Sequence, residues 1–183
     1  DLSAFYFDIR KDTLYCDPLN SGKRKSTQIL LNVILNSLLK WFAPILSFTT
    51  EEIYQLISKK KKSIHLESFL NFPKKFENLE LHDKWSQLLK IRDVCNLSIE
   101  EKRANKEIGS SLEASLIINI DKKLLDLTSN IDFAELCITS SAEIFEHKNK
   151  DIKVATTKAK GNKCSLCWKI KEGKCFRNSC PNT

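Results

Sequence analysis

The stretch GSSLEASLIINI, residues 109–120, divides the chain into two regions of different pattern. Leu116, Ile118 and Ile120 alternate with other residues, which predicts a half-buried strand. Gly109, just before it, is a favourable residue to stop a preceding helix. We therefore expect a helical region up to residue 110 and a smaller α/β region after it.

Upstream of this boundary the apolar residues recur at helical spacing. Gln28–Leu46 carries such a stripe, which predicts a central, largely buried helix that Pro44 ends or kinks. Thr49, followed three residues later by Glu52, has the spacing of a capping box. A second helix is therefore expected to begin at Thr49.

A third, longer helix is expected just before the boundary. Asp83 is a favourable N-cap residue, and the apolar periodicity runs to about Ile108. Three or four helices, with an extended connector over residues 63–75, predict an up-and-down bundle over residues 1–110. The fold class is thus mainly α, with the bundle as its largest domain.

Downstream of the boundary the elements are shorter. Lys122–Asn130 is expected to form a helix, and residues 136–139, 144–147 and 152–155 read as strands. They predict a small α/β domain over residues 111–160. Residues 161–183 then form a separate terminal segment.

Four of the seven cysteines gather in that terminal segment. Two residues separate Cys164 from Cys167, and four separate Cys175 from Cys180, which is within the range of structural zinc sites. Four thiolates close a tetrahedral site, so the ion would stabilise the fold rather than activate water. Four free surface thiols are the alternative. The other cysteines are scattered and are expected to pack in cores: Cys16, Cys95 and Cys137.

Positive charge concentrates around these cysteines. The chain has a formal charge of +7, which favours an extended anionic partner such as a nucleic acid; a solvated basic surface is the alternative. The cations near the chain end are Lys148, Lys150, Lys153, Lys158, Lys160, Lys163, Lys169, Lys171, Lys174 and Arg177.

Five residues are candidates for contacts with a nucleic acid. Trp168 follows the first cysteine pair, where its ring either stacks on an unpaired base or packs on the α/β domain. Lys23 and Arg24 precede the central helix, where cations are disfavoured unless a phosphate offsets them; a solvated charge run is the alternative. Lys169 and Arg177 flank the cysteines.

The sequence contains no catalytic motif. The three histidines, His65, His82 and His147, are isolated, and no glycine-rich phosphate loop is present. No apolar run reaches the roughly 18 residues of a membrane span, and no signal peptide opens the chain. The residues alone therefore indicate a cytoplasmic binding module.

Several strings resemble the isoleucyl-tRNA synthetase family in order and spacing. The opening residues, DLSAFYFDIRKDTLY, resemble its anticodon-binding domain, and KCSLCW at 163–168 resembles its bacterial-type C-terminal zinc segment. Four residues separate Cys175 from Cys180, where the family usually has two. Further similar strings are APIL at 43–46, FTTEEI at 48–53, SIHL at 63–66, RDV at 92–94 and KEIGSSLEA at 106–114.

The resemblance implies a class I ligase that charges tRNA-Ile with isoleucine, using ATP and magnesium. Its catalytic and editing domains would lie upstream in the same chain, so no catalytic residue is expected here. The implied partner is the anticodon stem-loop of tRNA-Ile, and the implied state is a cytoplasmic monomer without membrane contact. The alternative is a free-standing, zinc-dependent module that binds a nucleic acid or a protein.

Overall fold

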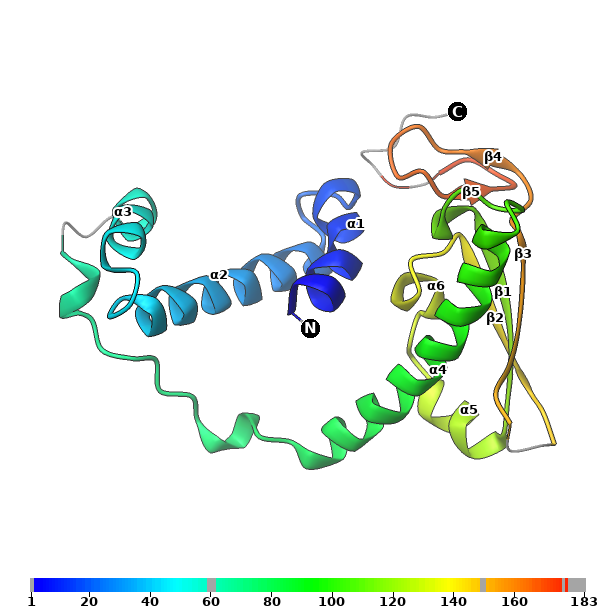
Figure 1. The fold of residues 1–183 in the computed structure, drawn as a ribbon, viewed down its shortest axis with the longest axis horizontal. Helices are drawn as coiled ribbons and strands as arrows, with labels where there is room; N and C mark the ends of the chain where they lie inside the picture. Colours follow the sequence, from blue (N-terminus) through cyan, green and yellow to red (C-terminus); the bar gives the residue numbers. More distant parts are fainter. Residues whose placement is uncertain (1, 59–61, 149–150, 176, 178–183) are drawn as a thin grey trace. The chain divides into compact units, whose positions relative to one another are not determined.

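A computed structural model describes residues 2–58, 62–148, 151–175 and 177 (Figure 1). The chain divides into two compact units, which are described separately: Asp1–Pro18 with Asn78–Thr183, and Leu19–Glu77. Helices predominate in both. Among the described residues, no helix has the length and apolar character required to cross a membrane.

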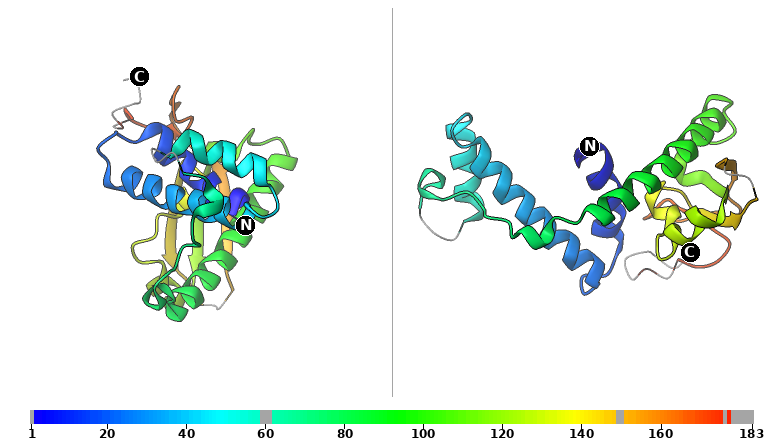
Figure 2. Two further views of the ribbon diagram at one scale, coloured as in Figure 1. Left: turned by 90° about the vertical axis from the view of Figure 1, so that its left-hand side faces the viewer. Right: turned by 90° about the horizontal axis from the view of Figure 1, so that it is seen from below.

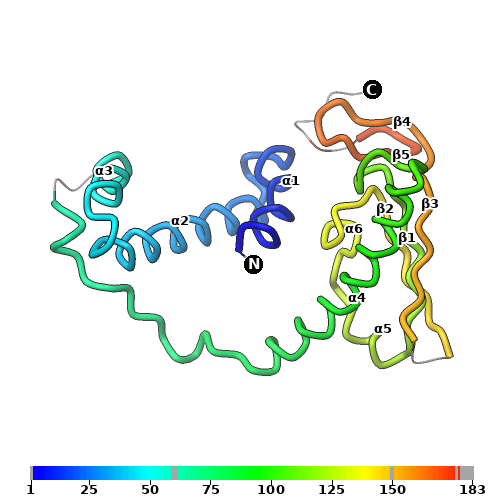
Figure 3. Tube along the Cα trace, in the orientation of Figure 1, coloured from blue at the N-terminus to red at the C-terminus, as the bar shows by residue number. Residues whose placement is uncertain are grey.

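The Leu19–Glu77 unit contains two α-helices and a connector. Helix α2 runs over Gly22–Phe42 and helix α3 over Ser47–Ile57 (Figure 3). Helix α2 ends just before Pro44, as predicted. Both helices and the short 3-10 turn Ile64–Leu66 contribute to a small core, whose buried members are Leu39, Ala43, Tyr54 and Ile64.

The expectation that the central helix is largely buried was wrong for this structure. Ile29 is 66% exposed and Trp41 53% exposed, whereas Thr27, Ser37 and Leu39 are buried. Two helices and a connector offer α2 one contacting face, so its other apolar residues remain at the surface.

The predicted start of α3 was also wrong. The helix begins at Ser47, and its N-cap, Leu46, makes no side-chain cap. The amide of Leu46 donates to Phe42 O at 2.7 Å, so the turn after α2 leads directly into the next helix. Thr50 then donates its hydroxyl to Leu46 O at 2.9 Å, and Thr49 lies inside the helix.

The other unit is built on a three-stranded sheet. Strand β1, Ala114–Ile120, is central; β2, Ser141–Glu146, pairs with it in parallel, and β3, Lys153–Lys158, pairs antiparallel. The predicted alternation is confirmed, because Leu116 and Ile118 are fully buried.

Three helices cover one face of this sheet (Figures 1 and 2). Helix α4, Leu79–Ala104, packs against β3 and β1, and α5, Lys122–Thr128, and α6, Phe133–Leu136, pack against β2. Helix α4 contributes a buried stripe one helical turn apart: Leu88, Ile91, Cys95 and Ile99.

The first segment of the chain belongs to the same unit. A π-helical turn, Leu2–Phe7, leads into α1, Asp8–Cys16. Ile9 enters the sheet core, and Arg10 Nη1 donates to Glu135 Oε1 of α6 at 2.9 Å. Residues far apart in sequence therefore place α1 beside the α/β region.

The predicted ends of α4 need correction. Its N-cap is Asn78, whose Oδ1 accepts from the amide of Leu81 at 2.9 Å, rather than Asp83. The helix ends at Ala104, because Lys106 takes a left-handed conformation with φ 59°. Gly109 lies beyond the helix, where its amide donates to Glu113.

One predicted strand is absent. Residues 136–139 complete α6 and its C-terminal turn, because Asp132 caps this helix by accepting from the amide of Glu135 at 3.1 Å. Ile138 has φ 56°, which is incompatible with an extended strand. The predictions of strands at 144–147 and 152–155 and of a helix after Lys122 are confirmed with shifted ends.

A two-stranded hairpin follows the sheet (Figure 3). It consists of β4, Asn162–Lys163, and β5, Ile170–Lys171. The amide of Ile170 donates to Ser140 Oγ at 2.6 Å, and the amide of Ala159 donates to Glu113 O at 2.8 Å. These bonds attach the hairpin to the ends of the sheet strands.

The alternation along β1 yields a stability prediction. Leu116→Ala should lower the free energy of unfolding by about 2–5 kcal/mol, because it leaves a cavity in the core. Ile117→Ala, on the opposite face at 37% exposure, should cost less than about 1 kcal/mol. Urea unfolding followed by circular dichroism measures both. Equal losses would contradict the assigned burial of β1.

Candidate metal centre and its basic surroundings

The terminal segment brings three predicted ligands together. The sulfur atoms of Cys164, Cys167 and Cys175 are buried and lie within 4.8 Å of one another. Cys167 Sγ and Cys175 Sγ are 3.9 Å apart. A tetrahedral ion with bonds of about 2.3 Å to sulfur requires sulfurs about 3.8 Å apart. The cluster therefore fits a metal ion; Cys180 lies outside the described residues.

Backbone hydrogen bonds shape the first cysteine pair. The amide of Trp168 donates to Cys164 O, and the amide of Cys164 donates to Lys169 O, both at 3.0 Å. The turn directs Cys164 and Cys167 to the same point. Gly161, with φ 117°, starts the hairpin; a Cβ there would lie 2.1 Å from Lys171 O, so a side chain is excluded.

The protonation of the cluster depends on the ion. Burial raises the pKa of the Cys167 thiol, despite an opposing backbone hydrogen bond from Lys169. A bound cation reverses this preference, because thiolates are the ligands and their protons are released. Lys171 Nζ lies 3.6 Å from Cys175 Sγ, where it stabilises a thiolate.

Cys16 from α1 packs beside these ligands, which the sequence did not indicate. Burial, followed by the nearby Asp12 carboxylate, raises the pKa of Cys16 to about 11. It is therefore a neutral thiol near neutral pH. Cys95 and Cys137 are buried in the sheet core, as expected for packing residues.

The Trp168 side chain is 59% exposed. Lys163 Nζ lies 5.9 Å from the centroid of its ring. The backbone of Trp168 is left-handed, with φ 61°, a conformation that is unfavourable for a bulky residue. Of the two alternatives for this ring, exposure favours contact with a partner over packing on the α/β region.

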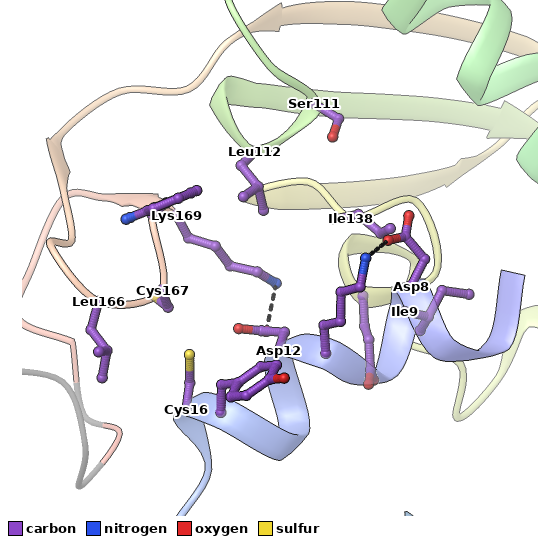
Figure 4. A pocket seen from close by; sticks show the side chains of 14 residues that line it. Asp8, Ile9, Asp12, Cys16, Ser111, Leu112, Ile138, Leu166, Cys167 and Lys169 are labelled. Atoms are coloured by element: carbon purple, nitrogen blue, oxygen red, sulfur yellow. Dashed lines mark hydrogen bonds and ion pairs between the residues drawn. The ribbon is translucent and has the colours of Figure 1, made fainter. Parts of the chain in front are cut away.

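Lys169 and Arg177 make ion pairs with α1. The pair of Lys169 with Asp12 is drawn in Figure 4. Arg177 Nη1 donates to Asp12 Oδ1 at 2.6 Å, and Lys169 Nζ lies 3.8 Å from Asp12 Oδ2. Burial raises the pKa of Asp12, but the hydrogen bond and charge of Arg177, with the charge of Lys169, outweigh it and hold this pKa below its usual value.

Lys23 and Arg24 lie in the first turn of α2, in the Leu19–Glu77 unit. The Ser21 hydroxyl accepts from the amide of Arg24 at 3.4 Å and caps the helix. Lys23 is exposed. The positive end of the helix dipole adds to these charges, which makes the turn attractive to an anion.

A cavity of about 430 Å³ lies between α1 and the metal segment (residues 161–183, described to Cys175 and at Arg177). Figure 4 shows Asp12 and Cys16 of α1 facing Lys169 and Cys167 across this space. The remaining wall is largely apolar, and includes Ile9, Leu112, Ile138, Leu166 and Trp168.

Comparison with known proteins identifies the family. Residues 1–118 match the family described as the anticodon-binding domain of tRNA ligase. The chain belongs to this family. The match covers both helices of the Leu19–Glu77 unit, α1, α4 and most of β1.

Relatives of this chain are named isoleucine–tRNA ligase. That of Pelagibacter ubique is 63% identical over 98% of this chain, which corresponds to 20% of the relative. That of Bradyrhizobium diazoefficiens is 40% identical over 94% of this chain and 18% of its own length. That of Agrobacterium fabrum is 39% identical over 93% of this chain and 19% of its own length. The chain thus spans about a fifth of the length of these relatives.

The cluster yields a metal-binding prediction. Cys167→Ser should lower the bound metal from about one ion per chain to nearly none, because it removes a ligand from a closed site. Cys95→Ala, in the sheet core, is the control and should retain the ion. Elemental analysis after gel filtration measures the ratio; full metal content in Cys167→Ser would overturn the assignment.

Proposed function

We propose that the chain is the tRNA-binding, anticodon-side portion of an isoleucine–tRNA ligase. The observation that carries the proposal is the family match over residues 1–118 together with 63% identity to the Pelagibacter ubique ligase. The longer enzyme would charge tRNA-Ile with isoleucine, using ATP and magnesium bound upstream. This chain would hold the tRNA, as a cytoplasmic monomer, and supply no catalytic residue.

We propose that the ion of the cysteine cluster is zinc. Cys180 would be the fourth ligand beside Cys164, Cys167 and Cys175, since four thiolates without an open position suit structural zinc. The 3.9 Å between two of the sulfurs supports this choice. When bound, zinc would supply folding free energy to a segment that lacks a large core.

The proposed domains are residues 1–110, 111–160 and 161–183. We propose that the helices of the first form an up-and-down bundle, in keeping with their number and lengths. The compact units divide the chain differently, because α1 and α4 pack with the α/β region. The proposed domains 1–110 and 111–160 would therefore contribute side chains to one hydrophobic core.

Trp168 is the foremost candidate for a tRNA contact. Its exposed ring and strained backbone support this role, since a residue kept at φ 61° without packing its ring indicates function rather than stability. Lys23 and Arg24 would contact phosphate groups from the first turn of α2. Lys169 and Arg177 stay candidates, although their charges already face Asp12.

The alternative, a free-standing zinc-dependent module for a nucleic acid or a protein, is less well supported. The relatives reported above are ligases about five times longer than the chain, and the matched region continues across both of its units. A module of independent origin would not be expected to share 63% of its residues with one of them.

Anticodon recognition can be tested by filter binding. The chain should bind tRNA-Ile at least about tenfold more tightly than a tRNA-Ile transcript with a substituted anticodon, because unpaired bases are read by stacking and edge contacts. A second transcript with a changed acceptor stem is the control and should bind like tRNA-Ile. Equal affinity for all three would contradict anticodon reading.

Trp168→Gly separates function from folding. Glycine accepts φ 61° without strain, so the metal segment should resist a chelator at least as well as the unmodified chain. Loss of the ring should weaken tRNA-Ile binding about five- to hundredfold, the equivalent of ~1–3 kcal/mol. Trp85→Phe, in α4, is the control. Unchanged affinity in Trp168→Gly would show that the ring does not contact tRNA.

A further inference from the structure

The metal segment is held against α1 by ion pairs that converge on one carboxylate. Asp12 faces Arg177 through Oδ1 at 2.6 Å and Lys169 through Oδ2 at 3.8 Å. Arg177 Nε also lies 3.5 Å from Asp17 Oδ1. The end of α1 therefore offers carboxylates to two cations of the segment.

The two cations have the same offset from metal ligands. Lys169 follows Cys167 by two residues, and Arg177 follows Cys175 by two residues. These cysteines have their sulfurs 3.9 Å apart. An ion that joins the two cysteine arms would thereby bring both cations to the same carboxylate.

We propose that Asp12 is a positioning residue for Trp168. By pairing with Lys169 and Arg177, it fixes the orientation of the metal segment on α1 and so the direction of the Trp168 ring. The inference rests on the proposed function, in which this ring contacts tRNA. It assigns Arg177 to the interior of the protein rather than to a phosphate.

The local backbone leaves Trp168 little independent freedom. The residue lies between a metal ligand, Cys167, and the paired Lys169. Its amide donates to Cys164 O, and Lys169 O accepts from the amide of Cys164. The orientation of the Trp168 ring is therefore set by the cysteine cluster through Cys167 and by the ion pair of Lys169 with Asp12.

Burial makes these ion pairs effective. The side-chain exposures are 10% for Lys169, 20% for Asp12 and 26% for Arg177. Water screens such pairs less than exposed ones. Removal of the Asp12 charge would take this ion pair from Lys169 and leave Arg177 with Asp17. Apolar packing does not replace them, because the cavity of about 430 Å³ lies along the same boundary.

Asp12→Asn tests the proposal, because asparagine has nearly the same shape without the charge. In the metal-loaded chain, affinity for tRNA-Ile should fall about five- to twentyfold, while the metal content stays near one ion per chain. Asp8→Asn is the matched control: it lies one turn earlier on α1 and has an exposed ion pair with Lys11. Its affinity should change by less than about twofold.

Combination with Trp168→Ala gives the decisive measurement. If Asp12 acts through the ring, Asp12→Asn should cause no further loss of affinity in the Trp168→Ala background. Arg177→Gln should behave like Asp12→Asn and leave the salt dependence of binding unchanged, whereas loss of a phosphate contact lowers the slope by about one. Additive losses, or a lowered slope, would overturn the proposal.

A measurement without RNA separates this inference from the proposed function. In a Trp41→Phe, Trp85→Phe background, Trp168 is the remaining tryptophan, since the chain has three. Asp12→Asn should change the acrylamide quenching of its fluorescence, and Asp8→Asn should not. Unchanged quenching in Asp12→Asn refutes positioning. Changed quenching in a chain that binds no tRNA refutes the proposed function alone.

Discussion

The pairing of β1 with a strand on each side is the constraint on which the sheet-containing unit depends. Its register sets Leu116 opposite Ala142 on β2 and Thr156 on β3. A slip by one residue would turn the buried side chains of β1 to solvent and bring Ser115 and Asn119 into the core. The helices on the covered face would then lose their packing surface.

The same strand also locates the metal segment. Just before β1, Leu112 O accepts a hydrogen bond from Ser140 Oγ. Ser140 Oγ in turn accepts a hydrogen bond from the amide of Ile170. One side chain thus connects the start of β1 to β5. Since β5 follows the first cysteine pair, the sheet determines where the cluster lies, and a bound ion would determine how its arms close.

The metal segment illustrates how a short segment replaces a hydrophobic core. Its buried side chains include Cys164, Cys167, Cys175 and Lys169. Thiols and one cation bury too little apolar surface to order a loop. An ion bound by the thiolates would, together with the carboxylate that joins the cations, supply what apolar packing cannot. Cys16 of α1 packs against these cysteines as a neutral thiol.

The sequence predicted the periodic elements well. It predicted poorly which of several suitable residues begins or ends each element. Strand β1 and helices α2, α3, α4 and α5 were predicted from the residue pattern, whereas α1 and α6 were not. The positions of helix ends do not follow from pattern. Asn78 and Asp83 are both good caps, and in the structure Asn78 accepts the capping hydrogen bond from the amide of Leu81. The Asp12–Arg177 pair joins residues 165 positions apart, a separation over which no spacing rule operates.

Cysteine spacing predicted the three cysteines that cluster in the structure. It gave no account of Trp168, which lies between Cys167 and Lys169. At φ 61° a glycine would satisfy the turn, and tryptophan there costs about 1–2 kcal/mol of backbone strain. Packing offsets only part of this cost, because Trp168 is 59% exposed. Lys163, 5.9 Å from the ring centroid, supplies a cation that suits a base and its phosphate as partners. The proposed contact of the ring with tRNA would account for the residue type at position 168.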